Sequence, residues 1–321
     1  MSCFYPLTAY WATPYGSGIT FVKKETIYTT NPLQIKCGRC TGCRLEYTRQ
    51  WALRIKHEAE LHTNNSFITL TYNDSHLPKN GTLLLEDFQK FMKRLRKELS
   101  PKKISFYHCG EYGEQGSKRP HYHAIIFNHQ FTNLQSIGTK KQPLYTSQQL
   151  HNLWKKPLTK KAKPTSIGHH SIGNVTFESA SYVASYVQKK LTGPRADAIN
   201  MSNGLRHYER MTPEGEVITL KPEYATMSRN PGIAGNWLTQ NHTDIYPSDF
   251  VTHKGKKHSL PLYYDLQYAK LTEKNPEILE NIKLKRSAKM QQLAHLFTPE
   301  ALKQKEVHHK AKMALYKRNT L

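Results

Sequence analysis

Two strand-like segments separated by a short polar loop constrain the fold of this chain more than any other feature. Residues 104–112 and 121–127 are rich in aromatic and β-branched side chains, and the loop between them contains Gly113 and Gly116. Strands joined by a short glycine-containing loop pair as an antiparallel hairpin. The sequence therefore predicts a hairpin from residue 104 to residue 127.

Helix and strand patterns alternate on both sides of this hairpin. The predicted elements are helix 41–62, strand 67–72, helix 88–99, strands 104–112 and 121–127, helix 147–154, strand 174–177 and helix 179–191. Helical spacing is clearest in residues 88–99, where apolar side chains recur at i, i+3, i+4, i+7 and i+11. This order predicts an α+β fold, an antiparallel sheet with helices packed on one face, of the ferredoxin-like or split βαβ type.

Composition divides the chain into three segments and indicates the class of partner. Residues 1–66 carry a cysteine cluster, residues 67–195 the sheet core, and residues 196–321 a looser basic region. The chain has 47 Lys and Arg against 24 Asp and Glu, a net charge of +23, which predicts an anionic partner and nucleic acid first. The first ten residues lack a secretory signal, and the apolar run 124–127 is far shorter than the ~20 residues of a membrane span. We therefore expect a cytosolic protein with no membrane partner.

A His-x-His pair on the second hairpin strand is the first candidate site. His121 and His123 are two residues apart on a strand, so their imidazoles point to the same face and can meet one metal ion. If the loop is symmetric, Glu111 lies opposite His121 and Cys109 opposite His123, which makes Glu111 the expected third ligand and Glu114 its rival. Two imidazoles and a carboxylate leave open positions for a catalytic divalent ion. The alternative is a surface hairpin with incidental histidines.

A pair of tyrosines on the last predicted helix is the second candidate site. Tyr182 and Tyr186 are at i and i+4 and are therefore neighbours on one helix face, with Lys189 and Lys190 following. Tyrosine can attack phosphorus and hold a DNA strand as an ester, while a cation pairs with the phosphate. The alternative is an amphipathic helix whose tyrosines pack in the core.

The third candidate site is a cysteine cluster. Cys37, Cys40 and Cys43 are spaced as Cys-x-x-Cys-x-x-Cys, and Cys3 could complete a tetrahedral set. Thiolates at this spacing favour structural Zn²⁺, with free buried thiols and an iron–sulfur cluster as the alternatives.

Taken together, these motifs resemble those of the HUH endonucleases, a family of rolling-circle replication initiators, relaxases and some transposases. The matching segments, in the family's order, are Phe67–Tyr72, Glu111 with Arg119–His123, and Tyr182-x-x-x-Tyr186 with Lys189 and Lys190. The tyrosine motif looks most like that of initiators from small icosahedral single-stranded DNA phages. The Cys-Gly-x-Cys-x-x-Cys-Arg run and residues 227–232 resemble the gokushovirus branch of the microviruses.

The resemblance implies a replication initiator that nicks and rejoins DNA. Mg²⁺ or Mn²⁺ on His121, His123 and Glu111 would polarise the scissile phosphate. One tyrosine would attack and leave a 5′-phosphotyrosine and a 3′-OH that primes a host polymerase, and Tyr186 is slightly favoured because it is nearer the lysines. The second tyrosine would cleave the regenerated origin, and the displaced strand would be closed into a circle.

This hypothesis requires surfaces that hold single-stranded and origin DNA. The expected contacts are cations beside the histidines, a lysine-rich loop and a stacking aromatic residue: Lys118, Arg119, Lys155, Lys156, Lys160, Lys161 and Trp154. The chain lacks a Gly-x-x-x-x-Gly-Lys-[Ser/Thr] motif, so unwinding is expected from a host helicase in the bacterial cytoplasm. The same chemistry would suit a plasmid relaxase or single-strand transposase. A basic zinc protein that binds or packages DNA without cutting it is the alternative of another class.

Overall fold

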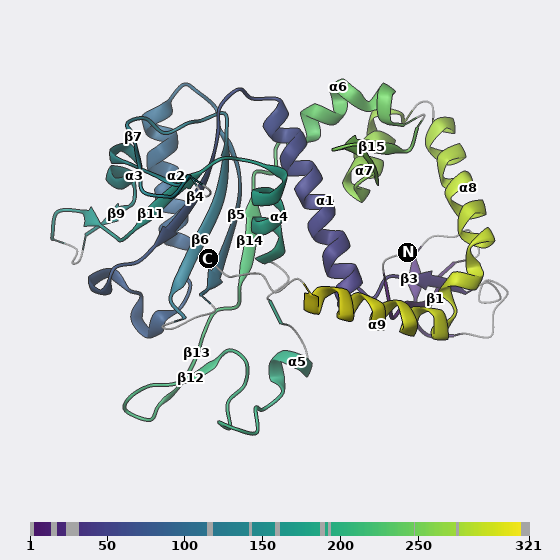
Figure 1. The fold of residues 1–321 in the computed structure, drawn as a ribbon, viewed down its shortest axis with the longest axis horizontal. Helices are drawn as coiled ribbons and strands as arrows, with labels where there is room; N and C mark the ends of the chain where they lie inside the picture. The colour runs from purple at the N-terminus through teal and green to yellow at the C-terminus, as the bar shows by residue number, and fades with distance from the viewer. Residues whose placement is uncertain are drawn as a thin grey trace. The chain divides into compact units, whose positions relative to one another are not determined.

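The computed structural model describes residues 3–13, 18–23, 32–113, 118–140, 143–157, 161–186, 190–191, 194–246, 248–273 and 276–315 (Figure 1). The chain divides into two compact units, of which unit 1 comprises residues 1–48 and 272–321 and unit 2 comprises residues 49–271. The predicted domain boundaries after residues 66 and 195 stay predictions. None of the helices in the described ranges has the length and apolarity needed to cross a membrane.

Unit 2 is built on a seven-stranded sheet in which every neighbouring pair is antiparallel. In spatial order the strands are β14 (Tyr224–Met227), β5 (Ser105–Tyr112), β6 (Pro120–Phe127), β4 (Asn65–Thr71), β11 (His170–Gly173), β8 (Tyr145–Ser147) and β7 (Leu134–Ser136). The predicted hairpin is the β5–β6 pair at the middle of this sheet. The predicted α+β class with an antiparallel sheet is therefore confirmed.

Helices cover both faces of the sheet, not the single face expected from the sequence. α2 (Leu85–Leu99) and α3 (Gln148–Leu153) pack on one face, where Phe91 and Leu150 are buried with Ile68 and Tyr122. α1 (Thr41–Glu60) and α4 (Phe177–Ser185) supply Ile55 and Val183 to the core on the other face. The reason is that β5 and β6 are each buried at six consecutive positions, so both of their faces need cover.

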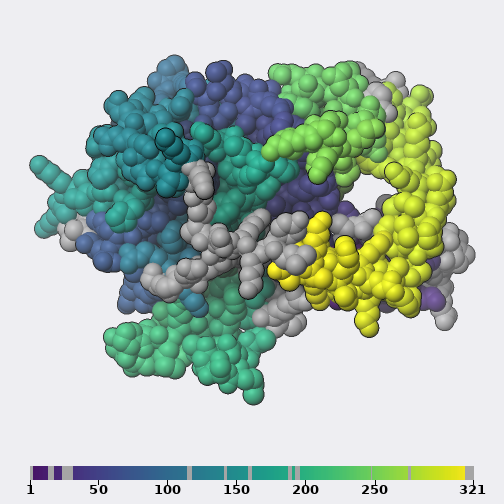
Figure 2. Space-filling view, viewed as in Figure 1, coloured from purple at the N-terminus to yellow at the C-terminus, as the bar shows by residue number. Residues whose placement is uncertain are grey.

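The remaining elements are shorter or peripheral. They are β1 (Leu7–Trp11), β2 (Ile19–Thr20), β3 (Leu33–Ile35), β9 (Lys155–Lys156), β10 (Thr165–Ser166), α5 (Pro194–Asp197), β12 (Glu209–Met211), β13 (Val217–Thr219), α6 (Gly235–Ile245), β15 (Phe250–His253), β16 (Lys256–Ser259), α7 (Leu262–Leu271), α8 (Glu277–Gln292) and α9 (Pro299–Leu315). Residues 194–222, with β12 and β13, form a lobe that stands off the rest of unit 2 (Figure 2).

The segment before the tyrosine helix differs from the prediction. The strand expected at residues 174–177 is β11, which ends at Gly173. Thr176 instead caps α4: its Oγ1 accepts from the Ser179 N–H, and the Ser179 hydroxyl accepts from the Thr176 N–H. This reciprocal cap starts the helix at Phe177. α4 ends at Ser185, with Tyr186 as its C-cap, earlier than the predicted end at residue 191.

Candidate active site and cysteine cluster

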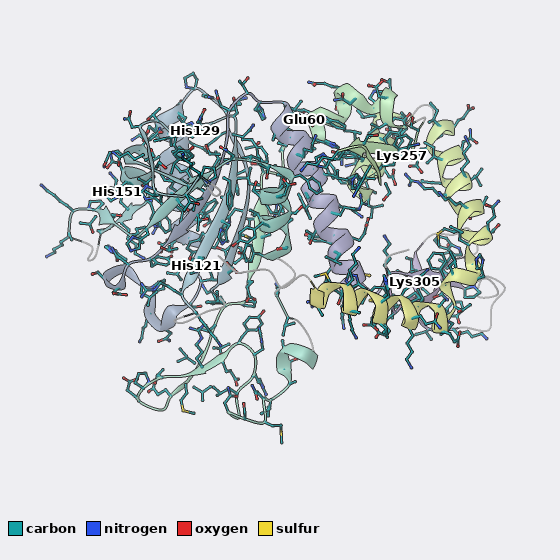
Figure 3. All side chains as sticks on the ribbon, in the orientation of Figure 1. Glu60, His121, His129, His151, Lys257 and Lys305 are labelled. Atoms are coloured by element: carbon teal, nitrogen blue, oxygen red, sulfur yellow. The ribbon has the colours of Figure 1, made fainter. Side chains whose placement is uncertain are left out.

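The register of β5 and β6 brings the predicted metal ligands onto one face of the sheet. Glu111 pairs with His121, and Cys109 pairs with His123, as the sequence predicted. Paired residues of an antiparallel sheet point to the same side, which here is the face covered by α1 and α4. Figure 3 shows His121 at one end of β6 and His129 beyond the other end, so the site lies at the hairpin-loop end of the sheet.

His121 is held by the backbone of its own loop. Its Nδ1 lies 2.6 Å from the Arg119 carbonyl oxygen, which also accepts the Gly113 N–H at 3.1 Å. A carbonyl only accepts, so Nδ1 carries the proton and the Nε2 of a neutral His121 keeps a lone pair. Burial lowers the pKa of His121, which favours this neutral form. A Cβ at Gly113 would lie 3.1 Å from the His121 ring, so a glycine fits this position closely.

His123 makes hydrogen bonds through both ring nitrogens. Its Nε2 lies 3.1 Å from Glu111 Oε1, and its Nδ1 lies 3.0 Å from Thr69 Oγ1 on β4. Glu111 thus reaches its diagonal neighbour, with both side chains about 6% exposed. Sequence reasoning did not single out Thr69, because a threonine in a strand is ordinary and only the β4–β6 register places it opposite His123.

Both tyrosines of the predicted pair lie against His123. The Tyr186 ring stacks on the His123 ring with centroids 4.8 Å apart and planes 2° from parallel. Tyr182 meets His123 edge-on at 5.4 Å and Tyr186 edge-on at 4.7 Å. The three rings therefore form one cluster on the sheet face that carries Glu111.

The environment of Tyr186 opposes ionisation of its phenol. Burial raises the pKa of Tyr186 well above its ordinary value, and the Glu111 charge and a hydrogen bond with Tyr182 raise it further. Tyr186 is 5% exposed, whereas Tyr182 is half-buried. The two phenols are chemically unequal in this state of the protein.

The donor set suits a divalent cation, although it is not fully gathered. Ligands at right angles and about 2.1 Å from an octahedral ion lie about 3.0 Å apart, which matches the 3.1 Å between Glu111 Oε1 and His123 Nε2. The ligand atoms of Glu111, His121 and His123 do not all lie within 4.8 Å of one another; within the described ranges, only the cysteine group discussed below meets that criterion. His121 would have to reorient to join the other two.

Two residues predicted to contact DNA have structural roles instead. Trp154 is fully buried among Tyr72, Tyr122 and Phe91, and its indole N–H donates to the Thr71 carbonyl, so it is not available to stack on a base. That prediction is wrong because the loop turns Trp154 into the core after α3.

The Lys156 ammonium is similarly engaged. It donates to Asp87 Oδ2 at 2.9 Å, and this buried carboxylate also accepts the Tyr72 hydroxyl. Lys156 therefore neutralises a buried charge next to the core. The prediction that it holds DNA backbone is not supported by this arrangement.

The other predicted cations differ in their surroundings. Arg119 donates to the Tyr72 carbonyl and to the exposed Asp74 carboxylate, which ties the hairpin loop to the segment after β4. Lys118, Lys161 and Lys190 are exposed, and Lys155 is half-buried. Glu114, Lys160 and Lys189 lie outside the described residues.

The four predicted zinc ligands meet in unit 1. The sulfur atoms of Cys3, Cys37, Cys40 and Cys43 all lie within 4.8 Å of one another. In a tetrahedral site with Zn–S bonds of about 2.3 Å, sulfur atoms are about 3.8 Å apart, so a small contraction completes the set. The cluster can bind a metal ion, and Cys3 is its fourth member despite its distance in sequence.

Backbone N–H groups point at the sulfur atoms, as is expected around thiolates. The Cys40 sulfur accepts from the Phe4 and Cys43 N–H groups at 3.3 and 3.4 Å, and the Cys3 sulfur accepts from the Cys37 N–H at 3.3 Å. Burial raises the pKa of Cys40, but these donors outweigh it and lower that pKa to about 7. The cluster is thus prepared to hold negative charge on sulfur.

Comparison with known proteins agrees with the position of the site. The family model for replication-associated proteins of the ORF2 type matches residues 65–191, the segment that contains Glu111, both histidines and both tyrosines. No solved structure matches the chain.

Relatives extend the likeness beyond this segment. Replication-associated protein VP4 of Bdellovibrio phage phiMH2K is 29% identical over 296 residues, which cover 89% of this chain and 83% of VP4. Replication-associated protein ORF2 of Spiroplasma virus 4 is 31% identical over 245 residues, 72% of this chain and 66% of that protein. Replication-associated protein ORF4 of Chlamydia phage 1 is 32% identical over 165 residues, 49% of this chain and 38% of that protein. The chain belongs to the ORF2 family of phage replication-associated proteins.

Proposed function

We propose that this protein initiates rolling-circle replication as a metal-dependent, tyrosine-using nickase of the HUH type. The observation that carries the proposal is the contact of both Tyr182 and Tyr186 with His123, on the sheet face that holds Glu111. A structural tyrosine pair has no need of a metal-ligand donor set beside it. A tyrosine nuclease needs the phenols and the metal ligands within reach of one phosphate.

The nicking step is a transfer of a phosphoryl ester. The phenol oxygen of one tyrosine forms a bond to the scissile phosphorus and loses its proton, while the bond from phosphorus to the 3′ oxygen breaks. The 3′ oxygen takes up a proton and becomes the 3′-OH primer, and the 5′ phosphate stays on the tyrosine. No hydrolysis occurs, so the ester retains the strand for later rejoining.

Glu111, His121 and His123 would hold Mg²⁺ or Mn²⁺ at this site. Such an ion supplies charge that polarises the phosphate and favours loss of the phenol proton. The protein's own part is to keep both phenols beside the donor set and to raise the pKa of Tyr186 through burial and the Glu111 charge until that charge is neutralised. Exposed Lys190 follows α4 as a candidate phosphate contact.

The second tyrosine explains how one protein can both open and close a circle. After one round of displacement synthesis, the free phenol cuts the regenerated origin, and the released 3′-OH attacks the first phosphotyrosine. Tyr182 and Tyr186 lie 4.7 Å apart by ring centroid, so both can serve one phosphate site in turn. Host helicase and host polymerase in the bacterial cytoplasm complete the reaction sequence.

The cysteine cluster has a separate, structural part in this proposal. Zn²⁺ held by Cys3, Cys37, Cys40 and Cys43 would stabilise unit 1, which otherwise has few buried apolar residues around the cluster. The cluster and the net charge of +23 also favour the second candidate function, a zinc protein that binds or packages DNA without cutting it.

One experiment separates these functions. Labelled single-stranded DNA fragments tiled from the protein's own replicon are incubated with it in Mn²⁺ or in EDTA and then resolved on denaturing gels. We expect a metal-dependent covalent adduct whose mass maps to Tyr182 or Tyr186 and whose position marks the nick. Salt-sensitive binding to every fragment, with no adduct on any, would favour the packaging function. The sequence of the nicked site distinguishes an initiator from a relaxase or transposase.

A further inference from the structure

We infer that Thr69 is a positioning residue for His123, whose hydroxyl can serve either protonation pattern of that imidazole and so keeps the ring in place when a divalent cation binds. The inference rests on the proposed function, because it concerns the proposed metal ligand. It adds a residue to which no chemical role has been assigned.

The contacts of His123 leave Thr69 as the partner of its Nδ1. Thr69 Oγ1 lies 3.0 Å from Nδ1, and Glu111 Oε1 lies 3.1 Å from Nε2 on the opposite side of the ring. Phe67 stacks at 6.1 Å with planes 18° apart, and Tyr186 stacks at 4.8 Å. These aromatic contacts fix the plane of the ring, and the two hydrogen bonds fix its rotation within that plane.

The proton on His123 has to change nitrogen when the site is loaded. An ionised carboxylate only accepts, so in the metal-free site Nε2–H donates to Glu111 and Nδ1 accepts from the Thr69 hydroxyl. With a cation on Nε2, the single ring proton must be on Nδ1, and Thr69 Oγ1 then accepts it. A hydroxyl can donate or accept, so the ring keeps its position in both states.

His121 differs in this respect, and the difference makes the role of Thr69 specific. The partner of His121 Nδ1 is the Arg119 carbonyl, which only accepts, so that ring already has its proton on Nδ1. A hydroxyl is required only beside His123, whose Nε2 has an acidic neighbour. Neither valine nor alanine at position 69 could replace it, whereas serine could.

Two measurements on the zinc-loaded full chain test the inference. In ¹⁵N histidine NMR of the wild type, we expect the His123 N–H on Nε2 without added metal and on Nδ1 in saturating Mg²⁺. In Mn²⁺ titrations followed by electron paramagnetic resonance, we expect Thr69→Val to weaken binding by about 10- to 100-fold. Thr69→Ser should stay close to the wild type. Thr71→Val is the matched control, because Thr71 is the next same-face residue of β4 and its hydroxyl bonds the His169 carbonyl instead.

The outcomes separate this inference from the function on which it rests. An N–H that stays on the same nitrogen of His123 in Mg²⁺ overturns the inference without any variant. So does a Thr69→Val protein with wild-type Mn²⁺ affinity, if His123→Ala abolishes that binding; the proposed metal site then stands. If His123→Ala also binds Mn²⁺ like the wild type, the metal part of the proposed function fails and the inference fails with it.

Discussion

Tyr186 lies face to face with His123, at a centroid distance of 4.8 Å and with the ring planes 2° from parallel. In this arrangement one of the two proposed nucleophiles covers a proposed metal ligand. DNA therefore has to displace the Tyr186 ring before that phenol can reach a phosphate beside His123. Tyr182 touches the same imidazole only edge-on and is half-buried, so it needs less rearrangement.

This inequality predicts different effects of the two single Tyr→Phe changes. We expect Tyr182→Phe to slow formation of the first covalent adduct by about tenfold or more, and Tyr186→Phe to leave that first step nearer the wild-type rate. Each single variant should fail to close circles, and the double variant should form no adduct. The measurement is single-turnover adduct formation on an origin oligonucleotide in Mn²⁺.

Tyr145→Phe serves as the control for loss of a phenol, since Tyr145 lies on β8 away from the ring cluster. A slower first step in Tyr186→Phe than in Tyr182→Phe would mean that DNA binding opens the stack, and it would restore the order of attack favoured by the lysine positions. An adduct in the double variant would contradict the tyrosine mechanism as a whole.

Removal of metal from the cysteine cluster should release α9 within unit 1. Phe4 and Tyr5 directly follow Cys3; the Phe4 ring lies 5.7 Å from the His309 ring, and the Tyr5 hydroxyl donates to Glu306. Ligation of Cys3 therefore fixes the segment that contacts α9. We expect about one Zn²⁺ per wild-type chain, and faster proteolysis within residues 299–315 after chelation.

The matched variants are Cys40→Ser and Cys109→Ala. Cys40→Ser should lose the bound zinc and reproduce the proteolysis of the chelated wild type. Cys109 is buried on β5 and is not a member of the cluster, so its change should leave the zinc content intact. Equal zinc content in both variants would exclude the four-cysteine site.

Trp154 should act on stability and not on DNA binding. It is fully buried, and its Nε1–H donates to the Thr71 carbonyl at 2.8 Å. Trp154→Phe leaves that buried carbonyl without its partner and removes part of the ring, which should lower the free energy of unfolding by about 1–3 kcal/mol. Urea unfolding measures this change. Affinity for single-stranded DNA, measured while the variant is folded, should remain within twofold of the wild type; a tenfold loss would show that the indole does contact DNA.

The sequence predicted the hairpin and its register because the signal there is local. Alternation along residues 104–112 and 121–127, with a short loop, determines which side chains face together, so Glu111 could be placed opposite His121. The cysteines were also predictable, since their spacing and their small number left Cys3 as the natural fourth member.

Contacts between distant segments were not predictable in the same way. Trp154 resembles an exposed aromatic residue beside a lysine-rich loop, and only the packing of α3 on the sheet shows that it is buried. Lys156 could not be assigned to Asp87, 69 residues earlier, from charge alone. The second helical layer was missed because continuous burial of β5 and β6 follows from their central position in a seven-stranded sheet, which depends on strands as distant as β14.

His57 makes the stability of unit 2 sensitive to acid. It is buried, its ring stacks on Trp237 at 3.7 Å, and its Nδ1 lies 2.6 Å from the Tyr264 hydroxyl oxygen. Burial, followed by the charge of Lys56 and by His253, lowers the pKa of His57 to about 3. The unfolded chain takes up a proton near pH 6.5 that the folded chain refuses, so the stabilising contribution is complete above pH 6.5 and is lost as the pH falls toward 3.

Between pH 7 and pH 5, protonation of this one group in the unfolded chain should cost about 2 kcal/mol of stability. Urea unfolding at both pH values should show a loss smaller by about that amount in His57→Gln, whereas a change of the exposed His295 to Gln should leave the loss as in the wild type. An equal loss in His57→Gln and the wild type would assign the acid sensitivity to other buried histidines, such as His108 and His129, whose pKa values burial also lowers.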